Sequence, residues 1–100
     1  MSFDYLKSFR KQIDRVDGEI LFLIKRRFHL AKKVAKYKMD NNLDVEDINR
    51  EDEVIKNVLN QAGMMDLREK FIRDLFKTIM EESKIEQDKY VREKEEKKKK

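Results

Sequence analysis

A few polar side chains occupy positions where helical spacing predicts apolar ones. Arg27 stands between Leu23 and Leu30 in a row of apolar residues spaced three and four apart. Lys38 follows eleven residues later, close to three helical turns, so it projects from nearly the same side about 16 Å away. A cation inside an apolar stripe needs a partner, because burying an unpaired charge is costly. These two residues indicate an internal ion pair or a site for a small anion.

Two neutral hydrogen-bonding residues extend a second apolar row. Phe76 and Met80 define a stripe whose next members are Ser83 and Gln87. Taken singly, each exception has a structural explanation: Arg27 could pair with a buried Glu, Ser83 could bond to its own helix, and Gln87 could lie on a frayed end. Taken together, they predict a cavity among helices, lined by cations and neutral donors, that suits a small anion.

The elements that must position these residues are helices. The sequence has no Pro and two Gly, and 46% of it is charged, mostly Lys, Arg and Glu, which favour helix. A heptad row predicts a first helix over about 3–38: Leu6, Phe9, Ile13, Val16, Ile20, Leu23, Arg27, Leu30, Val34 and Tyr37. Such a helix is roughly 54 Å long, whereas a domain of this size is roughly 30 Å across. It must protrude, and its exposed seam calls for a second copy. Gly18 could mark a close helix crossing or a slight bend.

Two shorter helices are predicted after a connector rich in Asn and Asp. Asp47 or Asn49 caps the second helix, and Gly63 is its natural end. Asp66 and Glu69 resemble a capping box that opens the third helix. The expected fold is all-α, with one long and two shorter helices per chain, in an intertwined helical homodimer. We expect the domain over residues 1–91 and a lysine-rich charged tail over 92–100.

Composition excludes several classes of protein. Without Cys, neither a disulfide framework nor a zinc-type cysteine cluster is possible. The N-terminus does not resemble a signal peptide and no segment could span a bilayer, so we expect a soluble, cytoplasmic protein without a membrane partner. The last seven residues contribute +3 of the net charge of +4. A basic end on a nearly neutral body is typical of a solvated tail, so no nucleic-acid partner is expected.

Three segments resemble the all-helical class of chorismate mutases: FRKQIDRVDGEILFLIKRRFHLAKKVAKYK, DINRE and FIRDLFKTIMEESKIEQ. The resemblance covers about residues 6–88. Eight polar residues match the family's binding residues in type and spacing: Arg10, Arg27, Lys38, Asp47, Arg50, Glu51, Ser83 and Gln87. The resemblance implies an intramolecular Claisen rearrangement of chorismate to prephenate, in phenylalanine and tyrosine biosynthesis, without a cofactor or covalent intermediate. The absence of a nucleophile–base constellation agrees with it, and the single histidine, His29, is expected on the surface.

The resemblance also implies a role for each residue. Arg10 and Arg27 would bind the two carboxylates, a task that suits guanidinium. Lys38 and Gln87 would donate hydrogen bonds to the ether oxygen as it becomes negative. Because position 87 is Gln rather than a titrating Glu, activity is expected to vary little across neutral pH.

The remaining residues of the expected site complete its shell. Glu51, with the backbone near Asp47, would hold the substrate hydroxyl, and Ser83 and Arg50 would complete the carboxylate shell. The apolar walls would be Val34, Val54 and Met80.

The spacing of two arginines makes the expected site a shared one. Arg10 and Arg27 are seventeen residues apart, which is about 25 Å along one helix. Chorismate is far smaller, so Arg10 must come from the partner subunit if both arginines touch one ligand.

Asp44 replaces a Pro common among relatives, which predicts a looser connector. The length leaves no room for a fused dehydratase or dehydrogenase, so a stand-alone enzyme is expected.

Two alternatives remain open at this point. Isochorismate pyruvate lyase shares this fold and a similar cationic pocket, although the Asp47, Arg50 and Glu51 turn resembles the mutases better. A non-enzymatic helical dimerisation module, or a basic-tailed nucleic-acid binder, would use the apolar seam. It would leave Ser83, Gln87 and the DINRE turn unexplained.

Overall fold

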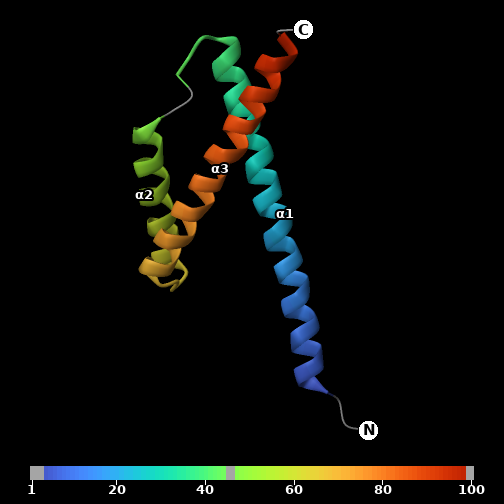
Figure 1. Cartoon of the computed structure of the whole chain (residues 1–100). Helices are drawn as coiled ribbons and strands as arrows, with labels where there is room; N and C mark the ends of the chain where they lie inside the picture. The colour runs from blue at the N-terminus through green and yellow to red at the C-terminus, as the bar shows by residue number, and fades with distance from the viewer. Residues whose placement is uncertain (1–3, 45–46, 99–100) are drawn as a thin grey trace.

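Three α-helices make up the computed structural model, which describes residues 4–44 and 47–98. In chain order they are α1 (Tyr5–Asp40), α2 (Ile48–Met64) and α3 (Glu69–Lys98), with no strand in the described ranges (Figure 1). The all-α prediction is confirmed. The predicted start of the first helix near Phe3 lies outside the described residues.

Helix α1 projects well beyond the other two. Its 36 residues extend about 54 Å, and the chain measures 67 × 33 × 17 Å along its principal axes. The Asp4 side chain caps the first turn by accepting from the Lys7 amide at 3.0 Å. Residues 5–23, which we call the arm, extend away from α2 and α3 (Figure 1). The predicted protrusion is confirmed.

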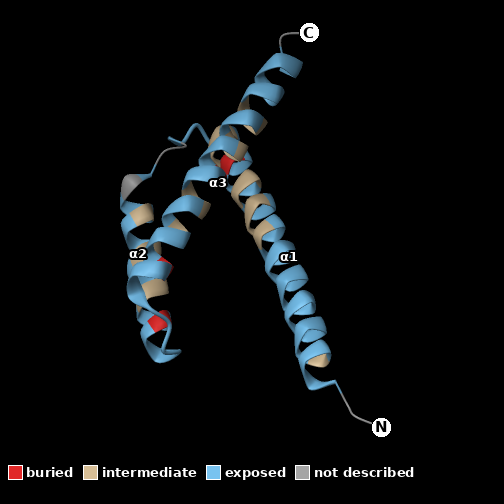
Figure 2. Ribbon diagram, turned by 60° about the horizontal axis from the view of Figure 1, so that its bottom comes forward, coloured by how far each residue is buried: buried red, intermediate tan, exposed pale blue. Residues whose placement is uncertain are grey.

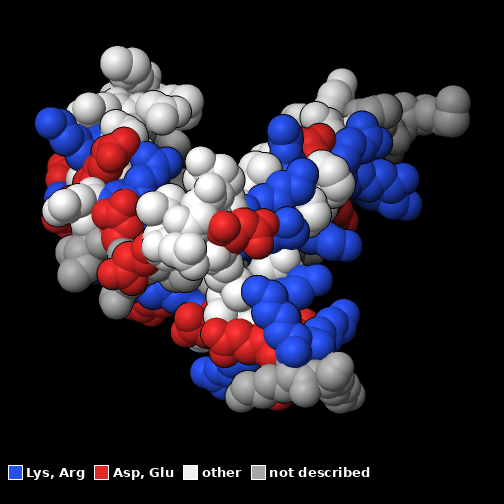
Figure 3. Space-filling model, turned by 90° about the horizontal axis from the view of Figure 1, so that it is seen from above, with Lys and Arg blue, Asp and Glu red and all other residues white. Residues whose placement is uncertain are grey.

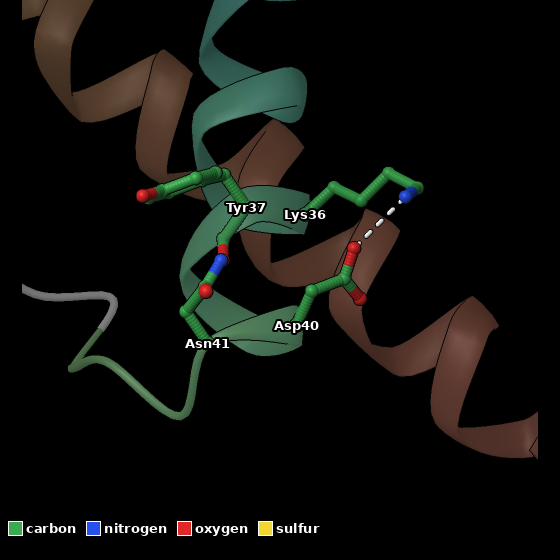
Figure 4. Close-up of polar contacts among 4 residues, drawn as sticks. All are labelled: Lys36, Tyr37, Asp40 and Asn41. Atoms are coloured by element: carbon green, nitrogen blue, oxygen red, sulfur yellow. Dashed lines mark hydrogen bonds and ion pairs between the residues drawn. The ribbon is translucent and has the colours of Figure 1, made fainter.

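The end of α1 is closed by asparagines rather than by glycine. Asn41 donates its side-chain amide to the Tyr37 carbonyl at 2.8 Å, while Lys36 pairs with Asp40 at 2.9 Å (Figure 4). Asn42 takes a left-handed φ of 55°, and the Leu43 amide bonds to the Lys38 carbonyl at 2.7 Å. This is a helix C-terminal motif in which Asn replaces the usual Gly. It turns the chain toward Asp44 just after α1.

Helix α2 starts as predicted but does not end as predicted. Asp47 is its N-cap, accepting from the Arg50 amide at 3.1 Å. The predicted stop at Gly63 is wrong, because the helix continues to Met64 and Gly63 has no positive φ. The predicted capping box is wrong as well. Asp66 has φ 55°, and the Leu67 amide beside it bonds back to Ala62 at 2.9 Å, so Asp66 closes α2 instead of opening α3.

The chemistry of short acidic and amide side chains explains this error. Asp and Asn tolerate the left-handed region better than other non-glycine residues, since their side chains bond locally to the backbone. The sequence pattern therefore allowed Asp66 to be either a C-terminal residue of one helix or a cap of the next. In the structure α3 begins at Glu69, three residues later.

Helix α3 packs against both α1 and α2 and joins the molecule together. The buried residues of the described chain are few and mostly small: Ala35, Ala62, Ile72 and Ser83. They come from all three helices, and Figure 2 shows them where α3 meets its neighbours, surrounded by exposed ribbon. Small side chains let helices approach closely, but they bury little apolar surface. The core within one chain is therefore minimal.

The C-terminal part of α3 is helical past the predicted domain limit. The helix runs without a break through residue 91 to Lys98, and residues 92–98 are exposed. The assignment of 92–100 as a separate charged tail stays a prediction, and its last two residues lie outside the described ones. Among the described helices, none has an apolar stretch long enough to cross a membrane.

Candidate active site

A cavity of about 570 Å³ lies between the C-terminal half of α1, the start of α2 and the middle of α3. We refer to this space as the cavity. Ten of the predicted site residues line it: Arg27, Val34, Lys38, Asp47, Arg50, Glu51, Val54, Met80, Ser83 and Gln87. They come from three helices and from positions up to sixty residues apart. A single chain therefore brings these ten residues to one cavity, and their roles in binding stay predictions.

Arg27 and Ser83 join α1 to α3 at the cavity wall. Arg27 donates from Nη1 to Ser83 Oγ at 2.9 Å, and Ser83 donates in turn to the Ile79 carbonyl at 2.9 Å. The structural explanation of Ser83 is confirmed, since it bonds to its own helix. It also orients the arginine, and its role in ligand binding stays a prediction. Burial, and then repulsion by Arg50, lower the pKa of Arg27. A nearby anion would offset both costs.

Gln87 repeats this connection one turn later. Its Nε2 donates to the Ala31 carbonyl at 2.8 Å. From the first bond to the second, the position rises by four residues on both helices: from Arg27 to Ala31 on α1, and from Ser83 to Gln87 on α3. The two helices therefore run in the same direction here. A carbonyl partner fixes the amide with its nitrogen toward Ala31, because the reverse orientation would oppose two acceptors. The second N–H of the amide can then donate to a ligand.

The first turn of α2 supplies the opposite wall. Asp47 caps this turn, and Arg50 pairs with Glu53 at 2.8 Å on the exposed side. Glu51 forms an ion pair from Oε1 to Lys84 Nζ on α3. A carboxylate in the first turn is also favoured by the helix dipole. The Glu51–Lys84 pair connects the DINRE segment to α3, and its residues line the cavity together with the cations of α1.

The charged residues that line the cavity balance one another. Four are cationic, Arg27, Lys38, Arg50 and Lys84, and four are anionic, Asp44, Asp47, Glu51 and Asp88. Figure 3 likewise shows Lys and Arg lying beside Asp and Glu on the face it presents. A dicarboxylate would therefore enter a cavity of no net formal charge in the single chain. One further cation would favour its binding.

Arg10 is the one predicted polar site residue that does not line the cavity. It lies exposed on the arm, seventeen residues before Arg27 on the same continuous helix, and so about 25 Å along its axis. Within one chain the two arginines cannot meet around a small ligand. The expectation that Arg10 acts from a partner subunit is consistent with this placement and stays a prediction.

Five further residues line the cavity that the sequence analysis did not assign to it: Leu30, Ala31, Asp44, Lys84 and Asp88. Leu30 and Ala31 follow Arg27 by three and four residues, so helical spacing alone could have included them. Lys84 and Asp88 directly follow Ser83 and Gln87, but no spacing rule shows that they reach the cavity. Their place depends on how α2 folds back onto α3.

Comparison with known proteins identifies the family of this chain. The family model described as chorismate mutase type II matches residues 9–88. A curated chorismate mutase of Methanocaldococcus jannaschii is 32% identical over 95 residues, which are 95% of this chain and 96% of the relative. A solved structure described as a conserved hypothetical protein from Pyrococcus furiosus is 37% identical, covers 86% of this chain and 99% of that one, and has a TM-score of 0.62.

Other relatives are much longer proteins. A bifunctional chorismate mutase/prephenate dehydratase of Buchnera aphidicola from Acyrthosiphon pisum is 32% identical over 84 residues, or 84% of this chain. The matched part is 22% of that relative. The chain thus spans less than a quarter of the length of this bifunctional protein.

Proposed function

Since this chain belongs to the chorismate mutase type II family, we propose that it isomerises chorismate to prephenate. The observation that carries the proposal is the cavity, which brings together ten of the eleven predicted site residues from three helices. The cavity also has the composition that the substrate requires. It offers guanidinium and ammonium groups for two carboxylates, neutral donors for an ether oxygen, and apolar walls for a ring.

The rearrangement needs no group of the protein to form a covalent bond. One C–O bond breaks and one C–C bond forms in a single cyclic movement of electrons within the substrate, and no proton is transferred. The cavity therefore acts by holding the substrate in a compact conformer and by stabilising developing charge. Arg27, already oriented by Ser83, is placed to bind a carboxylate. Lys38 and the second N–H of Gln87 are proposed to donate to the ether oxygen.

The remaining contacts of the proposal follow from the family resemblance and from the place of these residues in the cavity. Glu51 accepts from the substrate hydroxyl beside the backbone of Asp47, and Arg50 and Ser83 add to the carboxylate shell. Val34, Val54 and Met80 enclose the ring. We also propose that this enzyme is cytoplasmic and serves phenylalanine and tyrosine biosynthesis.

Incubation of the purified protein with chorismate tests this function directly. Prephenate is expected as the product, with no added metal or cofactor. Incubation with isochorismate in parallel separates the lyase alternative, which would release salicylate and pyruvate. Absence of prephenate from a folded protein would refute the proposal.

We also propose a homodimer in which each cavity is completed by Arg10 of the other subunit. Its support is the exposed seam of the arm, whose apolar residues from Leu6 to Leu23 are between 49% and 57% exposed, together with the balanced charge of the cavity. Mixing inactive Arg10→Ala chains with inactive Arg27→Ala chains tests the sharing. Heterodimers regain one intact cavity and therefore activity, whereas no recovery after verified subunit exchange would rule out a shared site.

A further inference from the structure

Lys84 lies in the cavity in a position that no comparison assigns to substrate binding. It belongs to α3, one residue after Ser83, and its Nζ forms an ion pair with Glu51 Oε1 of α2. Both partners line the cavity, between the first turn of α2 and the residues of α3. The pair thus connects two walls of the cavity through a carboxylate that lines it.

We infer that Lys84 is a positioning residue, which holds the Glu51 carboxylate so that it accepts from the ring hydroxyl of the substrate. This inference rests on the function proposed above. The ion pair engages Oε1, and the second oxygen of the carboxylate can accept a hydroxyl hydrogen. Without the lysine, the Glu51 side chain would have to give up several rotamers on binding, which costs free energy.

The charge of Lys84 matters for the same reason as its position. Glu51 is an anion that must lie near a dianionic substrate, and the two repel each other at close range. A cation paired with Glu51 offsets this repulsion locally. Removing it would leave four anions and three cations on the cavity walls of one chain.

The structure contains a matched control for this role. Lys32 on α1 pairs with Glu86 on α3 at 3.3 Å, with 40% and 29% of the two side chains exposed. The corresponding exposures of Lys84 and Glu51 are 48% and 33%. Both pairs connect α3 to another helix at similar exposure, but Lys32 and Glu86 do not line the cavity. Exposed ion pairs contribute only about 0.2–1 kcal/mol to stability, so neither lysine is needed for folding.

Steady-state kinetics of Lys84→Met, Lys84→Arg and Lys32→Met test the inference. Lys84→Met is expected to raise KM for chorismate about tenfold, the change that corresponds to about 1.4 kcal/mol of binding free energy, with little change in kcat. Lys84→Arg restores most of the affinity, because it keeps the charge. Lys32→Met resembles the wild type. Thermal unfolding of each variant verifies that it is folded.

A chorismate analogue without the ring hydroxyl distinguishes positioning from general attraction. Because Lys84 acts through Glu51 on that hydroxyl, the difference in KM between Lys84→Met and the wild type is expected to be much smaller for the analogue, with only the contribution of charge left. A tenfold difference that persists with the analogue would overturn positioning in favour of charge alone. In a Glu51→Gln background, Lys84→Met is expected to have no further effect on KM, and a full additional tenfold loss would also contradict the inference.

The same experiments separate this inference from the function on which it rests. Absence of prephenate formation by the wild-type protein would refute the proposed function. Prephenate formation with an unchanged KM in folded Lys84→Met would refute the role of Lys84 alone.

Discussion

The two halves of α1 share one heptad pattern but have different surroundings. In the arm, residues 5–23, every apolar seam position is about half exposed or more. In the half that carries the cavity, Leu30 and Val34 of the seam are also about half exposed, but Ala35 beside the seam is fully buried, and Arg27 and Ala31 are partly buried. The difference is α3, which crosses the second half and not the first (Figure 1).

This comparison separates what periodicity specifies from what it does not. The spacing of apolar residues determines which face of a helix avoids water, but not which element covers it. In the second half, α3 of the same chain covers the side of the seam that carries Ala35 and leaves Leu30 and Val34 about half exposed. Polar residues within the stripe line the cavity there. The arm has an equally regular stripe, and Arg10, one of its four cations, is the one proposed to serve a second chain.

Charging the arm seam is expected to have the largest effect. In the double variant Ile13→Glu/Ile20→Glu, two carboxylates would have to be buried against a partner helix, at a cost of several kcal/mol. Dissociation to monomers and loss of measurable chorismate mutase activity are expected. Analytical ultracentrifugation and the prephenate assay measure both. Arg15→Glu, on the outer face of the same arm, is the control and is expected to keep the proposed dimer. An active monomeric double variant would show that one chain completes the cavity.

Arg27→Met tests the other half and has the next largest effect. Loss of a charge-assisted carboxylate contact costs about 3 kcal/mol, so kcat/KM should fall about a hundredfold or more. Stability should change by less than about 1 kcal/mol, since only one hydrogen bond is lost and Ser83 keeps its bond to Ile79. Denaturant unfolding measures the second quantity. Arg26→Met, at an exposed position, is the matched control. A large loss of stability would indicate that Arg27 serves the fold rather than the ligand.

The sequence predicted the cavity better than it predicted the helix ends. Arg27, Ser83 and Gln87 stood out because each interrupts an apolar row, and a polar group inside such a row must find a partner. The local errors at Gly63 and Asp66 arose because short polar side chains suit both ends of a helix. The backbone φ of Asp66 separates those two possibilities, and the spacing of residues in the sequence does not determine this angle.

Long-range contacts could not be predicted from the sequence, for a different reason. The ion pair between Glu51 and Lys84 depends on the path of the α2–α3 turn and on how closely the two helices pack. Neither residue departs from a pattern, since charged residues are common on helices throughout this chain. Only the family resemblance directed attention to Glu51, and nothing in the sequence did so for Lys84.

The pH dependence of the activity of Gln87→Glu tests whether residue 87 acts as a hydrogen-bond donor in the cavity. In the wild type an amide donates to the Ala31 carbonyl, and activity is expected to be nearly flat across neutral pH. A carboxyl group there can donate only while protonated, so the variant is active at low pH and loses activity as the pH rises. About a tenfold fall in kcat/KM per pH unit is expected above the pH at which that proton is lost. Equal pH profiles for variant and wild type would show that position 87 does not donate to the reacting ether.

Gly18→Ala has the smallest expected effect and tests the face of the arm opposite the seam. Within one chain, a Cβ added at Gly18 meets no atom within 4 Å. Ala lowers the free energy of a helix interior by about 0.5–1 kcal/mol relative to Gly, so the variant should unfold at a slightly higher temperature. Scanning calorimetry at several protein concentrations measures the shift. If the partner helix crosses closely at this point, the methyl group would clash, and the variant would instead be destabilised and dissociate more readily. Because Gly18 lies on the face of the arm opposite the seam, the sign of the change tells whether a second chain also covers that outer face.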